Sequence, residues 1–217
     1  MIDGVELEID REAVVVQARR PLHVVASAPL GGGVGEARAI VNVHVAKSFR
    51  CEETERVLAD FVRRRDIASP YVGLLTAAWT EKAEVATATA DGLTAVALVT
   101  VGLSNAIGAG RGAAAVWTPS TINTIVLVDA APGPAALVNL VITATEAKTL
   151  ALAEAQVRAA DGGLASGTST DAVVVAATGH GRDCRFGGPA SGLGAVAARA
   201  VKSALEAGIR RWLRENS

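Results

Sequence analysis

Apolar and polar residues alternate along the first part of the chain with the period of a β-strand. Val5–Ile9 interleaves valine, leucine and isoleucine with glutamate, and a period of two is typical of a half-buried strand. Residues 13–18 and 22–28 predict two further strands that are separated at Pro21, because proline cannot donate to a strand ladder. Residues 39–46 predict a fourth strand.

The second half of the chain predicts buried strands and a hairpin. Residues 84–90 and 93–103 flank Asp91-Gly92, and such a pair between two apolar runs favours a hairpin turn. Residues 121–129 and 171–177 are short, strongly apolar runs, which is typical of strands buried on both faces. Residues 71–78 fit neither a strand nor a helix clearly.

Three segments predict helices. Residues 51–66 place Val57, Leu58, Phe61 and Val62 on one stripe, which indicates an amphipathic helix. Residues 135–159 and 193–213 predict two more. Because hairpins mix with helical crossovers, about eight strands and three main helices indicate an α+β fold, with a mixed, largely antiparallel sheet covered by helices. No repeat or low-complexity linker interrupts the sequence, so we expect one layered domain over residues 1–217.

Composition and charge exclude several classes of function. The net charge is −1 and basic residues are scattered, which argues against a nucleic-acid partner. Cys51 and Cys184 are the two cysteines and form no spaced motif, so we expect a reduced, cytoplasmic protein. Residues 92–110 carry no charge but contain several glycines and polar residues. We therefore expect a buried strand and a polar turn there, and no membrane partner.

Three asparagines interrupt or end apolar strands. They are Asn42, Asn105 and Asn123. Burying an unpaired amide costs a few kcal/mol, and an amide offers two donors and an acceptor that suit the binding of other amides. Each asparagine alone fits a structural hydrogen bond better than a site, but three together favour a site.

The long helix carries a polar stripe. Asn139, Thr143 and Glu146 are spaced to share one face, which is typical of either a cleft wall or a solvated surface. Lys148 lies about 200° around the axis from Glu146, so the two side chains do not pair. Glu146 could act as a general base and Lys148 could steady a charge; alternatively, both are exposed.

A loop rich in hydroxyl groups precedes the last strand. Residues 165–171 contain Thr168, Thr170 and Asp171, which could supply a nucleophile or hold an oxyanion. The same residues also fit ordinary side-chain turns. The glycines at 31–35 match neither a P-loop nor a dinucleotide fingerprint. His23, His44 and His180 are widely spaced, so we predict no metal site.

Taken together, these polar islands resemble the adenosylcobinamide amidohydrolase family. No single island is diagnostic, but they follow the family's order over most of the chain, and the departure is Pro119-Ser120, where a glycine is expected. The matching stretches are Ala26-Ser27-Ala28-Pro29-Leu30-Gly31-Gly32-Gly33, Asn42, Gly73-Leu74-Leu75-Thr76-Ala77-Ala78, Gly102-Leu103-Ser104-Asn105-Ala106, Thr121-Ile122-Asn123, Thr145-Glu146-Ala147-Lys148 and Gly167-Thr168-Ser169-Thr170-Asp171.

The resemblance implies hydrolysis of the amide that joins aminopropanol to the corrin ring, giving adenosylcobyric acid in corrinoid salvage for cobalamin synthesis. It implies no cofactor, because the cobalt belongs to the substrate. Fitted to that reaction, Glu146 would be the general base on water, with Lys148 or Asp171 serving the leaving amine and Thr168 as the competing nucleophile. The backbone of Gly31, Gly32 and Gly33, or Asn105, would stabilise the oxyanion. The expected substrate-binding residues are Asn42, Asn123 and Thr170. Tyr71, Trp79 or Trp117 would stack on the adenosyl group or the corrin, and they fit a plain core role equally well.

Two other functions stay open at this point. A non-catalytic corrinoid-binding protein for delivery or storage would use the same amide-rich pocket, and a general amidase would act on another small substrate. The sequence does not give the oligomeric state and is compatible with a homo-oligomer.

Overall fold

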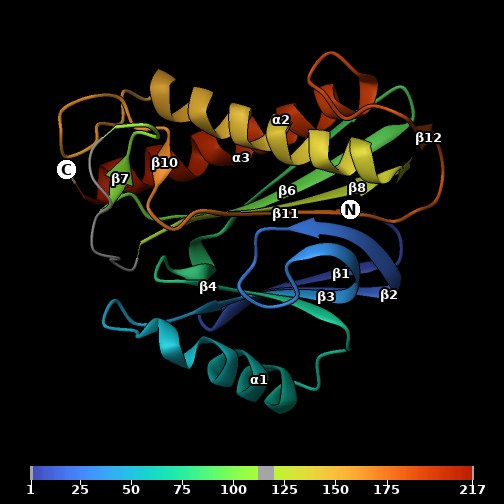
Figure 1. Ribbon diagram of the computed structural model, residues 1–217, viewed down its shortest axis with the longest axis horizontal. Coiled ribbons are helices and arrows are strands. Elements are labelled where there is room, and N and C mark those ends of the chain that lie inside the picture. Colours follow the sequence, from blue (N-terminus) through green and yellow to red (C-terminus); the bar gives the residue numbers. More distant parts are fainter. Residues whose placement is uncertain (1, 112–119, 217) are drawn as a thin grey trace.

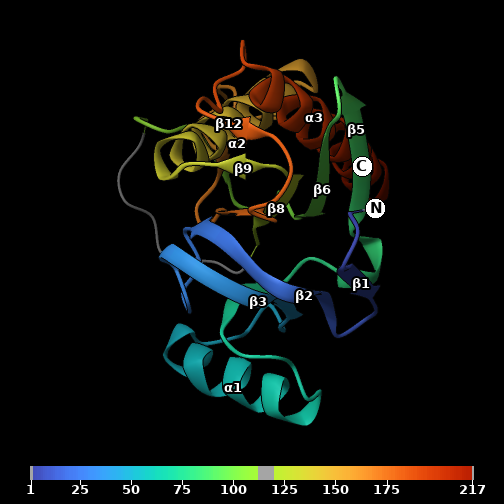
Figure 2. The ribbon, with the colours of Figure 1, turned by 90° about the vertical axis from the view of Figure 1, so that its right-hand side faces the viewer.

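An eight-stranded sheet runs through the molecule, and its two halves face each other between layers of helices (Figures 1 and 2). The computed structural model describes residues 2–111 and 120–216. The strands of this sheet lie in the order β4-β3-β2-β11-β8-β6-β5, with β1 paired to β2. Their bounds are β1 Val5–Ile9, β2 Ala13–Ala26, β3 Gly33–His44, β4 Tyr71–Thr76, β5 Glu84–Ala90, β6 Leu93–Val101, β8 Ile122–Asp129 and β11 Ala172–Ala177.

Helices cover both outer faces of this arrangement. The helix α1 (Thr54–Arg64) lies on the side of β3 and β4, and α2 (Pro134–Glu154) and α3 (Gly192–Glu215) cover the opposite side (Figure 1). Two short helical turns, η1 (Cys51–Glu53) and η2 (Thr80–Lys82), complete the helical elements of the described residues. Two small ribbons pair β7 (Ala106–Ile107) with β10 (Gly167–Thr168), and β9 (Ala131–Pro132) with β12 (Asp183–Cys184).

The strand pairing confirms the predicted mixed, largely antiparallel sheet. Two pairs are parallel, β3 with β4 and β8 with β11, and the other pairs of this sheet are antiparallel. Parallel neighbours need a crossover connection. Accordingly, α1 connects β3 to β4 and α2 connects β8 to β11.

Alternating side chains of the strands form separate apolar cores. Between the two halves of the sheet, Ile40 and Leu74 pack in one cluster with Leu98 and Ile125. A second core lies between the sheet and the helices α2 and α3, and a third lies beneath α1 around Leu58 and Phe61. Because each central strand is covered on both faces, its sequence is apolar at nearly every position.

The structure corrects the predicted break at Pro21. The predicted strands 13–18 and 22–28 form one strand, β2, and its register with β3 shifts between Gln17 and Leu22. Pro21 falls within this irregularity, where a missing N–H is tolerated. The ambiguous segment 71–78 contains β4, and the long helix ends at Glu154, five residues before the predicted end. Gln156 then adopts a positive φ of 54°.

The uncharged segment 92–110 is not a helix. It contains β6, which is buried in the sheet, and a turn that follows Val101, as predicted. One described helix, α2, is long and apolar enough to cross a membrane by length and composition. Half of its most apolar window is buried against the rest of the protein, and a core helix of a layered fold meets the same criteria.

A close backbone approach at the start of α3 requires glycine. A Cβ atom at Gly194 would lie closer to the carbonyl oxygens of Gly187 and Gly188 than any real Cβ contact. We expect Gly194→Ala to lower the free energy of unfolding by about 1–3 kcal/mol, the usual cost of overpacking. Urea denaturation measures this change.

Gly192→Ala is the matched control, two residues earlier in the same turn. Its Cβ would meet Leu93 Cδ1 at 3.4 Å, an ordinary van der Waals contact. Alanine also favours a helix over glycine by about 0.5–1 kcal/mol, so this variant should be as stable as the parent or slightly more stable. Equal destabilisation of both variants would contradict the close approach.

Candidate active site

The carboxylate of Asp171 gathers donors from three segments of the chain. It accepts the backbone N–H groups of Ile122 and Thr168, each at 3.0 Å, from β8 and β10. It also accepts hydrogen bonds from the Thr168 hydroxyl and from the Lys148 ammonium of α2. A carboxylate offers about four lone-pair sites, so these donors hold Asp171 in one orientation.

Lys148 and Asp171 form a buried ion pair. Lys148 is 7% exposed, and the Asp171 side chain is 10% exposed. Removing two charges from water costs several kcal/mol per ion, which is recovered only with good geometry and further hydrogen bonds. The backbone and hydroxyl donors to Asp171 supply those hydrogen bonds.

Thr168 is held against this ion pair by the backbone of a short ribbon. Thr168 is buried on β10, which pairs with β7. The preceding residue is glycine, and a Cβ atom at Gly167 would press on the Asp171 carboxylate and lie 3.0 Å from Lys148 Nζ. The Thr168 hydroxyl, the Asp171 carboxylate and the Lys148 ammonium therefore lie in contact. We call this group the Lys148–Asp171–Thr168 cluster.

The carbonyl oxygen of Ser120 fastens the neighbouring loops to this cluster. It accepts a hydrogen bond from Asn105 Nδ2 at 2.7 Å and one from the Thr170 hydroxyl at 2.8 Å. The Thr121 hydroxyl donates a hydrogen bond to the carbonyl of Thr170 at 2.8 Å. Asn105 Nδ2 also lies 2.7 Å from Ser169 Oγ. The segments around residues 105, 120 and 170 are thereby fixed to one another.

Two buried asparagines connect the halves of the sheet beside the cluster. Asn123 Nδ2 on β8 donates to Asn42 Oδ1 on β3 and to the carbonyl of Leu75, each at 2.8 Å. Asn42 Nδ2 in turn donates to Thr100 Oγ1 on β6 at 3.0 Å. None of these bonds joins two strands that are neighbours in the sheet order, so the bonds cross the space between the halves.

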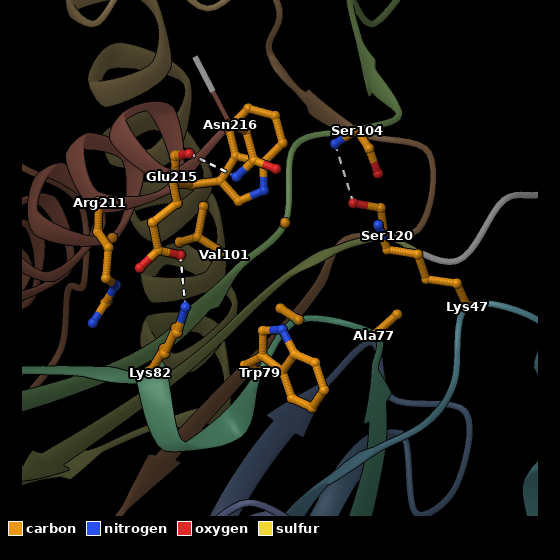
Figure 3. A pocket seen from close by; sticks show the side chains of 14 residues that line it. Lys47, Ala77, Trp79, Lys82, Val101, Ser104, Ser120, Arg211, Glu215 and Asn216 are labelled. Atoms are coloured by element: carbon orange, nitrogen blue, oxygen red, sulfur yellow. Dashed lines mark hydrogen bonds and ion pairs between the residues drawn. The ribbon is translucent and has the colours of Figure 1, made fainter.

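Two pockets adjoin this polar region and share Ala77 and Ser120 as lining residues. The smaller, which we call the Asp171 pocket, has a volume of about 230 Å³. The larger, the Trp79 pocket, has a volume of about 500 Å³ (Figure 3). Polar residues lining the Asp171 pocket are Ser27, Thr54, Thr76, Ser120, Thr121, Asn123, Thr170 and Asp171.

The structure brings most of the predicted site residues together and leaves others apart. Those around the cluster are Lys148, Thr168, Asp171, Asn42, Asn105, Asn123 and Thr170. Glu146 is exposed on α2, on the side of the helix opposite buried Lys148. Its role as a base stays a prediction.

The predicted glycine loop lies at the edge of the sheet rather than in either pocket lining. Gly31 packs against the carbonyl of Tyr71 and Gly32 against the carbonyl of Ala28, where a Cβ atom would collide. Gly33 begins β3. Gly31 and Gly32 thus have a packing role, and oxyanion stabilisation by the backbone of the three glycines stays a prediction.

The aromatic residues predicted to stack on the substrate also lie in different parts of the molecule. Tyr71 packs against the core beneath α1, and burial raises the pKa of its hydroxyl. Trp79 lines the larger pocket, and Trp117 lies outside the described residues.

Sequence reasoning missed several contributors to the site. Ser120 was noted only as a departure from the family, yet it lines both pockets and its carbonyl is the main acceptor of the region. Thr100 on β6 supplies the hydroxyl that ends the asparagine chain. The available signal was a hydroxyl residue at the end of a buried apolar strand, the same signal that singled out the asparagines.

Within residues 2–111 and 120–216, no group of three or more His, Cys, Asp or Glu side chains is placed to hold a metal ion. His23 lies near Glu36, and His180 lies 3.2 Å from an Arg20 nitrogen. His44 stacks on Trp79 instead. Both cysteines are free thiols.

A solved structure shares the architecture at low sequence identity. The PH0078 protein from Pyrococcus horikoshii OT3 matches with a TM-score of 0.50 and 14% identity, over 97% of this chain and 80% of that one. A Burkholderia sp. beta-aminopeptidase has a TM-score of 0.48 and 15% identity, over 93% and 79% of the two chains. At such identity, likeness concerns the fold alone.

Sequence relatives are more informative. The adenosylcobinamide amidohydrolase of Methanosarcina mazei is 35% identical over 150 residues, which is 69% of this chain and 67% of that protein. The family profile for adenosylcobinamide amidohydrolase matches residues 1–217. The chain therefore belongs to the adenosylcobinamide amidohydrolase family.

Proposed function

We propose that the protein hydrolyses the amide between aminopropanol and the corrin ring of adenosylcobinamide, with the Lys148–Asp171–Thr168 cluster as the reaction centre. Membership of the family supports the reaction. The buried Lys148–Asp171 ion pair is the observation that supports this place for the reaction centre. Its carboxylate also accepts a hydrogen bond from the Thr168 hydroxyl and lines a pocket.

Amide hydrolysis needs a nucleophile, a proton for the leaving amine and donors for the developing oxyanion. In this proposal Thr168 Oγ attacks the amide carbon and passes its proton to Asp171. The carbon–nitrogen bond then breaks as aminopropanol takes up that proton, and water hydrolyses the resulting ester to adenosylcobyric acid. Lys148 keeps Asp171 oriented and stabilises its negative charge.

The walls of the Asp171 pocket suit the rim of a corrinoid. Asn123, Thr121 and Thr170 line it. Their N–H and O–H groups are donated within the protein, and their oxygen atoms can accept hydrogen bonds from the peripheral amide N–H groups of the corrin. No metal of the protein's own enters this scheme, since the cobalt arrives with the substrate. The reaction would return incomplete corrinoids to cobalamin synthesis in the cytoplasm.

Removing the Thr168 hydroxyl tests the nucleophile. Thr168→Ala should lower kcat by about 10²-fold or more, the lower range for a group that takes part in the proton transfers. Thr168→Ser keeps a hydroxyl and should retain most of the turnover. Mass spectrometry of the corrinoid product measures both.

Thr145→Ala is the matched control. Thr145 is an exposed threonine of α2 whose hydroxyl donates to the carbonyl of Val141, so its loss should leave turnover unchanged. Full turnover by Thr168→Ala would rule out the covalent route through this hydroxyl.

Glu146 separates this route from direct attack by water. Glu146→Gln should keep its turnover, because the Glu146 side chain is exposed on α2 and points away from the buried cluster. If Glu146→Gln is inactive while Thr168→Ala is active, Glu146 is the base and water is the nucleophile. Both variants are compared by the same product assay.

The ion pair has a consequence for stability that does not depend on substrate. Lys148→Met leaves the Asp171 charge buried without its cation and should cost about 3–5 kcal/mol of unfolding free energy. Adding Asp171→Asn removes that charge, so the double variant should lose less than the sum of the single variants, by about 0.5–3 kcal/mol. Urea denaturation of the four proteins gives the coupling, and strict additivity would contradict a direct ion pair.

A further inference from the structure

Trp79 presents an aromatic surface to the larger pocket. Its side chain is 55% exposed, which is unusual for tryptophan. The ring of His44 stacks behind it, with centroids 4.7 Å apart and planes 17° from parallel. His44 Nδ1 donates to the carbonyl of Ala78 at 3.0 Å, which fixes the stack. One face of the Trp79 ring is therefore stacked on His44, and the other face is open.

The opposite wall of the pocket comes from the end of α3 (Figure 3). Trp212 adds a second indole, and Glu215 pairs with Lys82 at 2.7 Å across the pocket mouth. The hydrogen bond from Lys82 lowers the pKa of Glu215, so this side chain is a carboxylate acceptor at neutral pH. Aromatic faces together with a carboxylate acceptor suit a flat heterocycle that bears an amino group.

The two pockets are adjacent, because Ala77 and Ser120 line both of them. In adenosylcobinamide the adenosyl group and the aminopropanol arm leave opposite faces of the corrin ring. A corrinoid whose edge lies against Ser120 can therefore extend one substituent into each pocket. The Asp171 pocket holds the reaction centre, which leaves the Trp79 pocket for the other substituent.

We propose that the Trp79 pocket is the subsite for the adenosyl group, with the adenine ring stacked on Trp79. This inference rests on the proposed function, because it assigns the second half of the same substrate. Base stacking on an aromatic side chain is tolerant of orientation and does not need a charged ligand. Ser104 and Ser120, which also line the pocket, offer hydroxyl groups to the ribose.

Comparison of two corrinoids tests the assignment. The substrates are adenosylcobinamide and a cobinamide with cyanide in place of the adenosyl group. Trp79→Ala should lower kcat/KM for adenosylcobinamide about tenfold, the order expected for one lost stack, and leave the cyanide form unchanged. Trp79→Phe should recover most of the loss. An equal loss on both substrates would overturn the assignment and indicate contact with the corrin itself.

Phe186→Ala is the matched control, since Phe186 is an equally exposed aromatic residue, 61% exposed, that lines neither pocket. It should leave both substrates unaffected.

A binding measurement keeps the inference separate from the reaction. Saturation-transfer NMR of the intact protein with 5′-deoxyadenosine should show binding that Trp79→Ala removes. If neither corrinoid is cleaved but this binding is present, the proposed function fails and the nucleoside subsite stands. If adenosylcobinamide is cleaved but Trp79→Ala affects neither binding nor kcat/KM, the subsite fails and the proposed function stands.

Discussion

The carboxylate of Asp171 is the constraint on which the site depends, because segments far apart in sequence are held by this one group. β8 and β11 are parallel neighbours, so Ile122 and Asp171, at or just before the starts of these strands, lie at the same edge of the sheet. The crossover helix α2 runs back over the sheet toward that edge and brings Lys148 near its end. The topology thus sets the ion pair, and the ion pair fixes the loop that carries Thr168.

A second constraint acts between the halves of the sheet. Most of the space between them is filled by valine, leucine and isoleucine, whose packing is not directional. The hydrogen bonds from Asn123 to Asn42 and from Asn42 to Thr100 are directional. Each amide would be costly to bury without its partner. These hydrogen bonds therefore set the relative position of the halves at the end where the polar cluster lies. The pocket lined by Asn123 and Asp171 inherits its shape from that position.

Periodicity predicts the three helices and most of the long strands, but it does not give the orientation of the long helix. The 3.6-residue period correctly placed Glu146 and Lys148 on different sides of α2. It could not say which side is buried, because apolar residues occur on every side of α2 and Val138, Ile142 and Leu150 are exposed. The buried member is the lysine, which general burial preferences would not choose.

Tertiary contacts also explain the other differences. The break expected at Pro21 is a register shift within one strand, because neighbouring pairings continue on both sides of it. The asparagines were identifiable because each one interrupts an apolar run. The Trp79 pocket was not predictable as a unit, since it joins η2, the end of β6 and the end of α3, and nothing local in these segments indicates that they meet.

The burial of Lys148 and Asp171 bears on the choice between an enzyme and a protein that only binds corrinoids. A binding protein needs the pockets and their amide and hydroxyl walls, which the asparagines and threonines already provide. It gains nothing from a buried ion pair, since apolar residues of similar volume are generally as stabilising or more so. A carboxylate that lines a pocket and also accepts a hydrogen bond from a hydroxyl group is instead useful where a proton must be moved. The buried Lys148–Asp171 ion pair costs desolvation energy, and a protein that only binds corrinoids does not need it. The ion pair therefore favours catalysis over storage or delivery.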